Sequence, residues 1–158
     1  MPSFPEIFQS LAPVVWRFLR RLGVAESELE DLCQEVFLLV HDRLPTFDGD
    51  SSLKTWVLGI ALRVAANHRR LARVRREVPT ADLPDEAFEA PQEALIDQRS
   101  AIEQLQRVLT DLDEDKRAVF VLHDIEEVPM AQIAPLVGCP LQTAYARLYA
   151  ARRLLQAS

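Results

Sequence analysis

Apolar residues recur at intervals of three and four positions along most of the chain, which is the spacing of one face of an α-helix. The pattern runs over residues 5–22, 27–44 and 53–76, then stops, and resumes from about residue 91 to residue 155. Only four glycines and few aromatic residues accompany these runs. The pattern therefore predicts an all-α protein.

The apolar positions of each run identify the side chains that should face inward. They are Ile7, Phe8, Leu11, Val15, Phe18 and Leu22; Leu29, Leu32, Cys33, Val36, Phe37, Val40 and Leu44; Val57, Ile60, Ala61, Val64, His68 and Leu71; and Leu95, Ile102, Leu105, Leu109, Leu112, Val119, Phe120 and Leu122. Ser27 stands three positions before Glu30, a capping box that predicts the start of the second helix. Ser51 or Ser52 can cap the third helix, and Asp113 can cap a later short one.

Residues 130–155 have the pattern of two short helices separated by Gly138. Glycine permits the backbone of a tight turn, and Pro140 can occupy the first turn of the following helix. The expected inward positions are Ile133, Ala134 and Val137, then Leu141, Ala144, Leu148 and Ala151. The opposite side of the last helix carries Gln142, Thr143, Tyr145, Arg147, Tyr149, Arg152 and Arg153. Such side chains bond to bases and phosphates, so the segment predicts a helix-turn-helix; an ordinary hairpin with a solvated basic end is the alternative.

The second predicted helix has a mixed stripe beside its apolar one. This stripe contains Asp31, Glu35, Leu38 and Asp42, with Gln34 and Leu39 at its edge. Surface helices seldom expose neighbouring leucines, so the stripe indicates a surface for a partner. Packing of Leu38 or Leu39 on the first helix follows equally well from the periodicity.

The third predicted helix carries a polar stripe of Trp56, Arg63, Asn67 and Arg70, and five Arg without any Lys in residues 69–76. The planar fork of arginine suits phosphate better than the lysine ammonium does. The helix therefore indicates a nucleic-acid surface. In the alternative interpretation, Trp56 lies in the core and the arginines are a solvated cluster that favours the helix C-terminus.

The formal net charge of −6 does not exclude nucleic acid, because the acidic residues are concentrated in one segment. Residues 77–98 contain seven Asp or Glu, three Pro and no Lys or Arg. This composition is typical of a solvated, flexible linker. The sequence thus predicts two small helical domains, residues 1–76 and 99–158, joined by an acidic linker at 77–98.

Other classes of protein find little support in the chain. It has no apolar stretch as long as a membrane span and no secretion signal at its N-terminus, so we expect a cytoplasmic protein without membrane insertion. Cys33 and Cys139 fall in apolar helical patterns and are expected to be buried, reduced thiols. His41, His68 and His123 lack the spacing of metal ligands. No catalytic constellation or glycine-rich phosphate loop is present, so we expect no enzyme activity, cofactor, metal or small-molecule substrate.

Two blocks of the sequence resemble conserved regions of bacterial sigma factors. Asp31-Leu-Cys-Gln34-Glu35-Val-Phe37, Phe47-Asp-Gly49 and Lys54-Thr-Trp56-Val-Leu-Gly-Ile60-Ala61 closely resemble the second region. Residues 112–155 resemble the fourth, through Arg117-Ala-Val-Phe120-Val-Leu122, Ile133-Ala134, Gly138-Cys-Pro140-Leu-Gln-Thr143 and Arg147-Leu148. No segment long enough for the third region lies between them. The pattern, which covers nearly the whole chain, resembles the extracytoplasmic-function (group IV) class.

The resemblance implies a dissociable specificity subunit of RNA polymerase that directs initiation at promoters. In this family the Asp-x-x-Gln-Glu helix docks on the clamp helices of the largest polymerase subunit. The implied core-polymerase-binding residues are Asp31, Gln34, Glu35 and Leu38. The implied partners are core RNA polymerase, promoter DNA and an anti-sigma factor that covers one or both domains. The acidic linker is expected to pass through polymerase channels otherwise occupied by nucleic acid.

The same resemblance assigns the two DNA-binding surfaces. The third helix and the loop before it handle the −10 element, which implies roles for the loop at 47–52 and for Phe47, Lys54, Trp56, Arg63, Asn67 and Arg70. The last helix is expected in the major groove at the −35 element, with Gln142, Thr143, Tyr145 and Arg147 near bases or phosphates and Arg152 on the backbone. Because each domain has few phosphate contacts, the chain alone should bind promoter DNA poorly. A stand-alone dimeric helix-turn-helix regulator is the rival interpretation, and the docking stripe on the second helix distinguishes the two.

The sequence departs from the family pattern at several positions. Tyr145 stands where relatives commonly have a cation, so promoter sequences do not transfer from them. Pro135 falls inside the first helix of the helix-turn-helix and should shorten or kink it. Leu62 and Arg63 replace a commoner Arg-Asn pair in the second region.

Overall fold

The computed structural model describes residues 1–77 and 96–157, and every regular element in these ranges is helical. The elements are α1 (Phe4–Arg21), α2 (Glu26–Arg43), the 3₁₀ turn η1 (Leu44–Thr46), α3 (Leu53–Glu77), α4 (Ile96–Asp111), α5 (Glu114–Phe120), the π-helical turn η2 (Val121–Ile125), α6 (Met130–Val137) and α7 (Leu141–Gln156). The predicted all-α class is confirmed. Most of the expected linker lies outside the described residues.

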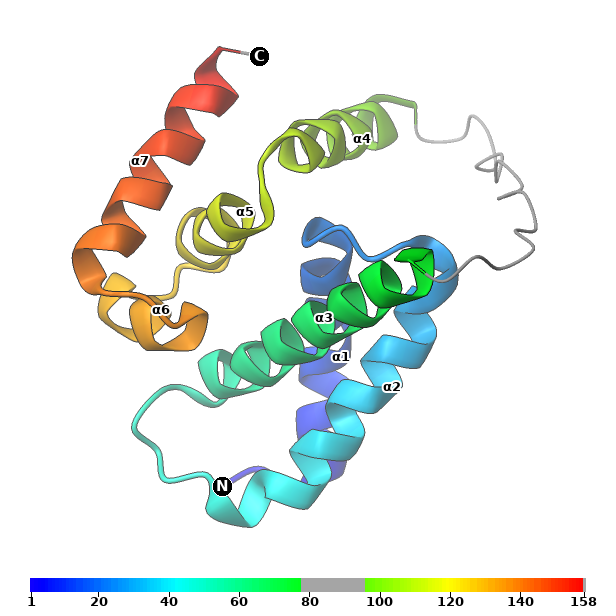
Figure 1. The fold of residues 1–158 in the computed structure, drawn as a ribbon. Helices are drawn as coiled ribbons and strands as arrows, with labels where there is room; N and C mark the ends of the chain where they lie inside the picture. Colours follow the sequence, from blue (N-terminus) through cyan, green and yellow to red (C-terminus); the bar gives the residue numbers. More distant parts are fainter. Residues whose placement is uncertain (78–95, 158) are drawn as a thin grey trace.

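Helices α1, α2 and α3 pack against one another as a three-helix bundle (Figure 1). Its fully buried side chains include Val15, Phe18 and Leu19 of α1, Leu29, Val36 and Val40 of α2, and Ala61 of α3. Complete burial of one such large apolar side chain is worth about 1.5–3 kcal/mol. The bundle is therefore held by the apolar stripes that the periodicity predicted.

Helices α5, α6 and α7 form the second group of packed helices, and η2 continues α5 directly. Its buried side chains include Val119, Leu122, Ile133, Ala144 and Leu148. Helix α4 joins this group through its C-terminal end, where Leu109 and the following Leu112 are buried. We call residues 1–77 the N-terminal half and residues 96–157 the C-terminal half.

Three predicted helix boundaries are confirmed by their capping groups. The Ser52 hydroxyl accepts the Thr55 N–H at 3.0 Å, and the Asp113 carboxylate accepts the Lys116 N–H at 2.9 Å. Gly138 has φ +74° and ψ +37°, the left-handed conformation that ends α6 and turns the chain toward α7. The helix-turn-helix backbone thus depends on a conformation that glycine adopts without strain.

The predicted capping box at Ser27 is wrong. Helix α2 begins at Glu26, and its N-cap is Ala25, which has no side-chain oxygen to accept a hydrogen bond. Val24 and Leu29 occupy the positions of a hydrophobic staple and are both buried. Burial of Val24 fixes where the chain enters the helix, so tertiary packing overrides the local capping signal.

Among the described residues, five that were expected to face inward are exposed instead, while Leu95 lies outside the described residues. Phe8, Leu71, Ile102, Leu105 and Leu141 each expose at least 36% of their surface. Leu71 lies near the end of α3, which has 25 residues and extends past the 18-residue helices that it packs against. Leu141 begins α7, and Ile102 and Leu105 precede the end of α4 that is buried. Periodicity identifies an apolar face but does not show where the neighbouring helix ends.

The two prolines of the helix-turn-helix lie inside α6 and at the start of α7, and the expected shortening or kink at Pro135 stays a prediction. Helix α6 continues through Pro135 to Val137, so this proline does not end the eight-residue helix. Pro140 is the N-cap of α7 rather than part of its first turn, because its ψ of 153° is extended and not helical, and its carbonyl accepts the Ala144 N–H at 3.0 Å. Proline has no N–H group, and no helical hydrogen bond is lost at this position, because an N–H there would have no acceptor within the helix.

Candidate polymerase-binding and DNA-binding surfaces

The mixed stripe of α2 lies on the outer side of the N-terminal bundle. Asp31, Gln34, Glu35 and Leu38 are all exposed, and Leu38 exposes 69% of its surface. Their spacing of three, one and three residues places them on one side of the helix, because a turn contains 3.6 residues. Leu39 is half-buried against the core, as the packing alternative predicted. Leu38 is exposed, as the partner-surface alternative predicted. The exposed Leu38 among acidic side chains is available to a partner.

An apolar groove lies beside this stripe, between α1 and α2. It has a volume of about 350 Å³ and is lined by Phe8, Ala12, Pro13, Trp16, Glu30, Cys33 and Gln34. Phe8 is 47% exposed and packs edge-on against the buried Phe37, with ring centroids 4.9 Å apart. The groove adds apolar area beside the exposed α2 stripe. Apolar area of this kind forms the buried centre of many protein–protein interfaces.

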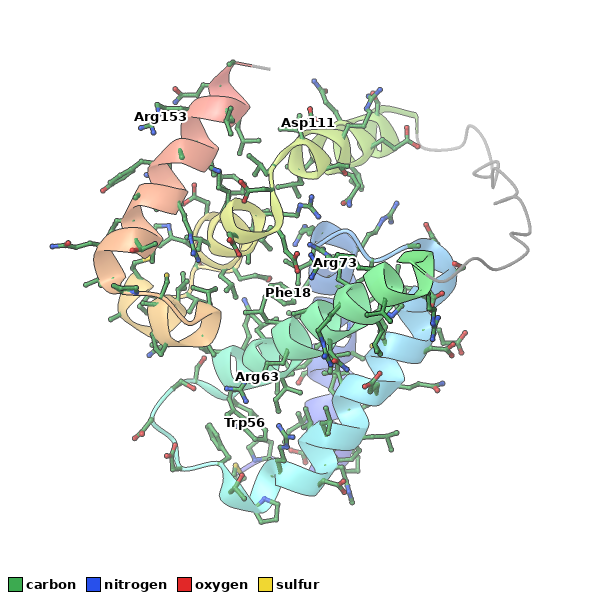
Figure 2. The ribbon with its side chains drawn as sticks, viewed as in Figure 1. Phe18, Trp56, Arg63, Arg73, Asp111 and Arg153 are labelled. Atoms are coloured by element: carbon green, nitrogen blue, oxygen red, sulfur yellow. The ribbon has the colours of Figure 1, made fainter. Side chains whose placement is uncertain are left out.

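The loop before α3 is joined to the helix by an aromatic contact. Phe47 and Trp56 are both half-buried, and their ring centroids are 5.2 Å apart. Trp56 packs partly on the core and also lines a cleft of about 450 Å³, together with Arg63 (Figure 2). The two interpretations of Trp56, core residue and surface residue, therefore both hold in part.

The polar stripe of α3 is exposed along one side of the helix. Arg63, Asn67 and Arg70 are solvent-accessible, and the Arg70 guanidinium donates to the Asn67 side-chain oxygen at 2.8 Å. Farther along, Arg69 and Arg73 lie 3.5 and 3.8 Å from the two carboxylate oxygens of Glu114 in α5. The arginine cluster is thus partly engaged by an acid of the C-terminal half.

Lys54, in the first turn of α3, contacts a carboxylate from the C-terminal half. Its ammonium donates to the Glu126 carbonyl oxygen at 3.4 Å and lies 3.9 Å from the Glu126 Oε1 atom. The Glu126 side chain is only 8% exposed, and its Oε2 atom is buried without a hydrogen-bond partner among the described residues. Burying a carboxylate with one unsatisfied oxygen costs free energy. The Lys54–Glu126 pair therefore stabilises the structure less than a fully hydrogen-bonded buried pair would.

Helix α7 exposes some of the side chains expected at DNA, opposite its buried face. Gln142 and Tyr145 are exposed, Thr143 is half-buried, and Ala144 and Leu148 are buried on the opposite side. The Tyr145 and Tyr149 rings lie 6.0 Å apart and nearly parallel. The exposed side therefore combines amide, hydroxyl and aromatic groups, which suit base edges and sugars.

Two cations of α7 are paired with acids of its own half. Arg147 lies 3.9 Å from the Asp115 carboxylate. Arg152 donates two hydrogen bonds to Asp124, at 2.7 and 2.9 Å, and His123 lies 2.7 Å from the same carboxylate. The hydrogen bonds from Arg152, and next from His123, lower the pKa of Asp124, while the bond to Asp124 raises the pKa of Arg152.

Four residues of this network had no role in the sequence interpretation. Glu114, Asp124 and Glu126 lay outside the quoted motifs, and Arg117 was part of a motif without an assigned contact. Their partners are distant in sequence, as in the pairs Lys54–Glu126 and Arg152–Asp124. No signal in a single sequence identifies such pairs.

The cysteines and the remaining classes of site can be placed as well. Both thiols are free; Cys33 is buried, which raises the pKa of its thiol, and Cys139 is half-buried. Within residues 1–77 and 96–157, no three His, Cys, Asp or Glu side chains gather as metal ligands would. No helix in these ranges has both the length and the apolar character to span a bilayer.

Family comparisons match both halves of the chain. Residues 7–75 match the model for sigma-70 region 2, and residues 102–155 match the model for sigma-70 region 4. The chain is 34% identical over 146 residues to the ECF RNA polymerase sigma factor SigC of Mycobacterium tuberculosis, covering 90% of this chain and 76% of that protein. It is 31% identical over 142 residues to the RNA polymerase sigma-H factor of Pseudomonas aeruginosa, covering 82% of this chain and 72% of that protein.

The fold agrees with these matches. The sigma factor RpoE, solved in complex with the anti-sigma factor NepR from Bartonella quintana, superposes with a TM-score of 0.72 at 21% identity, covering 98% of this chain and 94% of that one. The two matched regions contain most of the N-terminal bundle of α1, α2 and α3, and the helix-turn-helix of α6 and α7. The chain therefore belongs to the extracytoplasmic-function family of RNA polymerase sigma factors, which direct the polymerase to promoters.

Proposed function

We propose that residues 1–76 bind core polymerase and open the −10 element, and that residues 99–158 bind the −35 element, with 77–98 as the linker between them. The observation that carries this division is the pair of separate exposed surfaces on the N-terminal half: an acidic and leucine stripe on α2, and a basic and aromatic stripe on α3. One suits a protein partner and the other suits nucleic acid.

In this proposal the α2 stripe makes the contact with polymerase. Leu38 provides the apolar anchor, and Asp31 and Glu35 select a basic partner surface by charge complementarity. Gln34 lies at the edge of the apolar groove and can donate or accept hydrogen bonds there.

The DNA contacts divide between α3 and α7. Phe47 and Trp56 can stack on unpaired bases at the −10 element, and Lys54, Arg63, Asn67 and Arg70 hold the backbone or base edges there. On α7, Gln142, Thr143 and Tyr145 face base edges in the major groove, and Arg147 and Arg152 contact phosphates after leaving their present acidic partners.

The chain acts in the cytoplasm as a non-catalytic subunit, and the polymerase supplies the chemistry of RNA synthesis. An anti-sigma factor is a further partner in this proposal. The RpoE structure of similar fold contains such a protein, and the exposed surfaces of α2 and α3 provide places for one to bind.

The test uses purified core polymerase with the wild-type chain, Glu35→Arg and the control Glu103→Arg, which reverses an exposed acid on α4. Transcription on a library of genomic fragments shows whether the chain starts RNA synthesis at new sites. We expect Glu35→Arg to weaken core binding at least about tenfold without changing the melting temperature, and Glu103→Arg to bind like wild type. Failure of the wild-type chain to bind core or to start new transcripts would overturn the function, and unchanged binding by Glu35→Arg would overturn the α2 assignment.

A further inference from the structure

Helix α7 carries a row of polar and aromatic side chains along one side. The row consists of Gln142, Tyr145, Tyr149 and Arg152. Their spacing of three, four and three residues places them on one side of the helix, because a turn contains 3.6 residues. A recognition helix reads bases mainly with its N-terminal residues, so the proposed function places Tyr145 near base edges. Arg152 follows Tyr145 by two turns of the helix.

The two tyrosines of the row pack on each other. Their ring centroids are 6.0 Å apart, and the ring planes are inclined by only 29°. Tyr145 is 38% exposed and Tyr149 is 49% exposed, and neither belongs to the hydrophobic core that the described residues form. Tyrosine offers a large and rigid contact area, because only two side-chain torsions have to be fixed. This exposed pair is therefore suited to contact a ligand.

The guanidinium of Arg152 lies beside this pair and is held by an acid from another element. Its Cζ atom lies 6.0 Å from the centroid of the Tyr149 ring, at the limit of a cation–π contact. Its Nε and Nη2 atoms donate to the two carboxylate oxygens of Asp124, at 2.9 and 2.7 Å. Two such bonds fix the position and the plane of a guanidinium. Arg152 is thus held beside Tyr149 although its side chain is 41% exposed.

Asp124 is itself fixed by its surroundings. It belongs to η2, the π-helical turn after α5, a rare type of turn that is frequent at functional sites. The His123 Nδ1 atom lies 2.7 Å from the Asp124 Oδ1 atom, which also accepts from Arg152. Val121 and Leu122 of the same turn are fully buried, so the core holds the turn in place. The Asp124 carboxylate is therefore a firm support for Arg152.

The pair of Arg147 with Asp115 on the same helix has a different geometry. The Arg147 Nη2 atom lies 3.9 Å from the carboxylate, longer than a charge-assisted hydrogen bond, and the Asp115 side chain is 71% exposed. Exposed pairs of this kind contribute little to stability. Arg147 can leave its acid easily, whereas Arg152 is fixed by two short bonds. These two arginines are therefore suited to different tasks.

From this row we propose that Tyr145 selects a thymine in the −35 element and that Asp124 is the residue that positions it. Asp124 fixes Arg152, which limits the positions open to the neighbouring Tyr149 ring. The stacked Tyr149 ring then holds Tyr145 in place. Among the bases of DNA, only thymine presents a methyl group in the major groove, and this group takes apolar contacts. The inference rests on the proposed function of α7 at the −35 element.

The same geometry refines the phosphate contact proposed for Arg152. A guanidinium has five N–H donors, and Asp124 accepts from the Nε and Nη2 atoms. The donors of Nη1 are not used by this carboxylate, so Arg152 can reach a phosphate without leaving Asp124. Asp124 thus acts through Arg152 and Tyr149 and contacts no DNA itself.

The test uses holoenzyme made from core polymerase and the full-length chain. A promoter that wild type uses in the genomic library is randomised over its −35 element, and the selected templates show where thymine is preferred. At each such position the thymine is replaced with deoxyuridine, which pairs in the same way and lacks the methyl group. The measured quantity is the ratio of initiation rates on the two templates at a limiting concentration of holoenzyme.

We expect one position at which deoxyuridine lowers initiation by wild type about fourfold, the effect of burying one methyl group. Tyr145→Ala should reduce this ratio to less than about 1.5-fold, and Tyr145→Phe should keep it because the ring remains. Asp124→Asn and Arg152→Lys should each reduce it to less than about twofold, because both break the two-bond contact.

Asp115→Asn is the matched control. It removes the same charge as Asp124→Asn from the longer and more exposed pair, so it should keep the wild-type ratio. Removal of an acid strengthens contacts with phosphates of any sequence, which raises initiation on both templates and leaves their ratio unchanged. Partial loss of folding lowers initiation on both templates alike. The ratio therefore reports the position of the tyrosine ring and neither charge nor stability.

Two results would overturn the inference. In one, no thymine position shows a larger ratio with wild type than with Tyr145→Ala, which would show that Tyr145 does not contact a methyl group. In the other, Asp124→Asn and Arg152→Lys both keep the wild-type ratio, which would show that Asp124 does not position Tyr145. Failure of wild type to start transcripts with core polymerase is a separate result, which would overturn the proposed function and this inference with it.

Discussion

Arg117 allows a quantitative prediction, because one guanidinium supports the ends of two helices at once. It donates to the carbonyls of Leu109 and Leu112 at 2.8 Å, at and after the end of α4, and to Leu22 at 2.8 Å, after the end of α1. Helix C-termini leave carbonyl groups unsatisfied, and a cation is favourable there. Burial, and next the neighbouring Arg69, lower the pKa of Arg117, but arginine remains charged at neutral pH.

Replacing Arg117 with Met keeps most of the apolar stem and removes these three bonds, together with a longer one to the Thr110 carbonyl at 3.3 Å. A hydrogen bond from a charged donor contributes about 1.5–3 kcal/mol, and water can recover part of it because the arginine is only half-buried. The expected loss is about 3 kcal/mol in the free energy of opening of the C-terminal half. Arg117→Lys should lose about 2 kcal/mol, since a lysine ammonium lacks the fork that reaches carbonyls on different helices.

The measurement is hydrogen exchange of the α5 amides in the full-length chain over a series of urea concentrations, which reports the free energy of opening of that segment. Arg107→Met is the control, because Arg107 is an exposed arginine on α4 and its loss should change stability by less than about 0.5 kcal/mol. If Arg117→Met opens no more readily than this control, the carbonyl contacts of Arg117 do not stabilise the C-terminal half.

Three further predictions concern single groups. Gly138→Ala should destabilise the C-terminal half by about 1–2 kcal/mol through backbone strain alone, since no atom lies within 4 Å of an added Cβ, and Gly138→Asn should recover part of the loss in the same urea assay. The pKa of Asp124 is lowered in the folded chain, so its contribution to stability is present above the unfolded pKa and is lost as the pH falls through the folded pKa. Asp124→Asn should therefore flatten the acid side of the profile of stability against pH, measured by thermal unfolding. An unchanged profile would contradict the pair with Arg152. Cys139 should react with iodoacetamide faster than Cys33, whose thiol is buried and has a raised pKa; mass spectrometry after timed labelling gives the order, and faster labelling of Cys33 would contradict its burial.

The sequence by itself determined the helical class, the positions of most helices and the family. Apolar residues at helical spacing predicted α1, α2 and α3 to within a few residues, and Asp113, Ser52 and Gly138 marked boundaries that the structure confirms. These features are local: a cap, a left-handed turn or an apolar stripe requires only residues within a few positions of one another. The residue-level assignments at polymerase and DNA rest on the resemblance and stay predictions.

Only the tertiary structure decided which apolar faces are covered and which charges meet. The Ser27 cap failed because burial of Val24 sets the start of α2, and Leu71 is exposed because α3 extends past its neighbours. The pairing of Lys54 with Glu126 joins residues 72 positions apart in the sequence. Charge pairing of this kind depends on how two folded halves approach each other, and no local spacing encodes that approach.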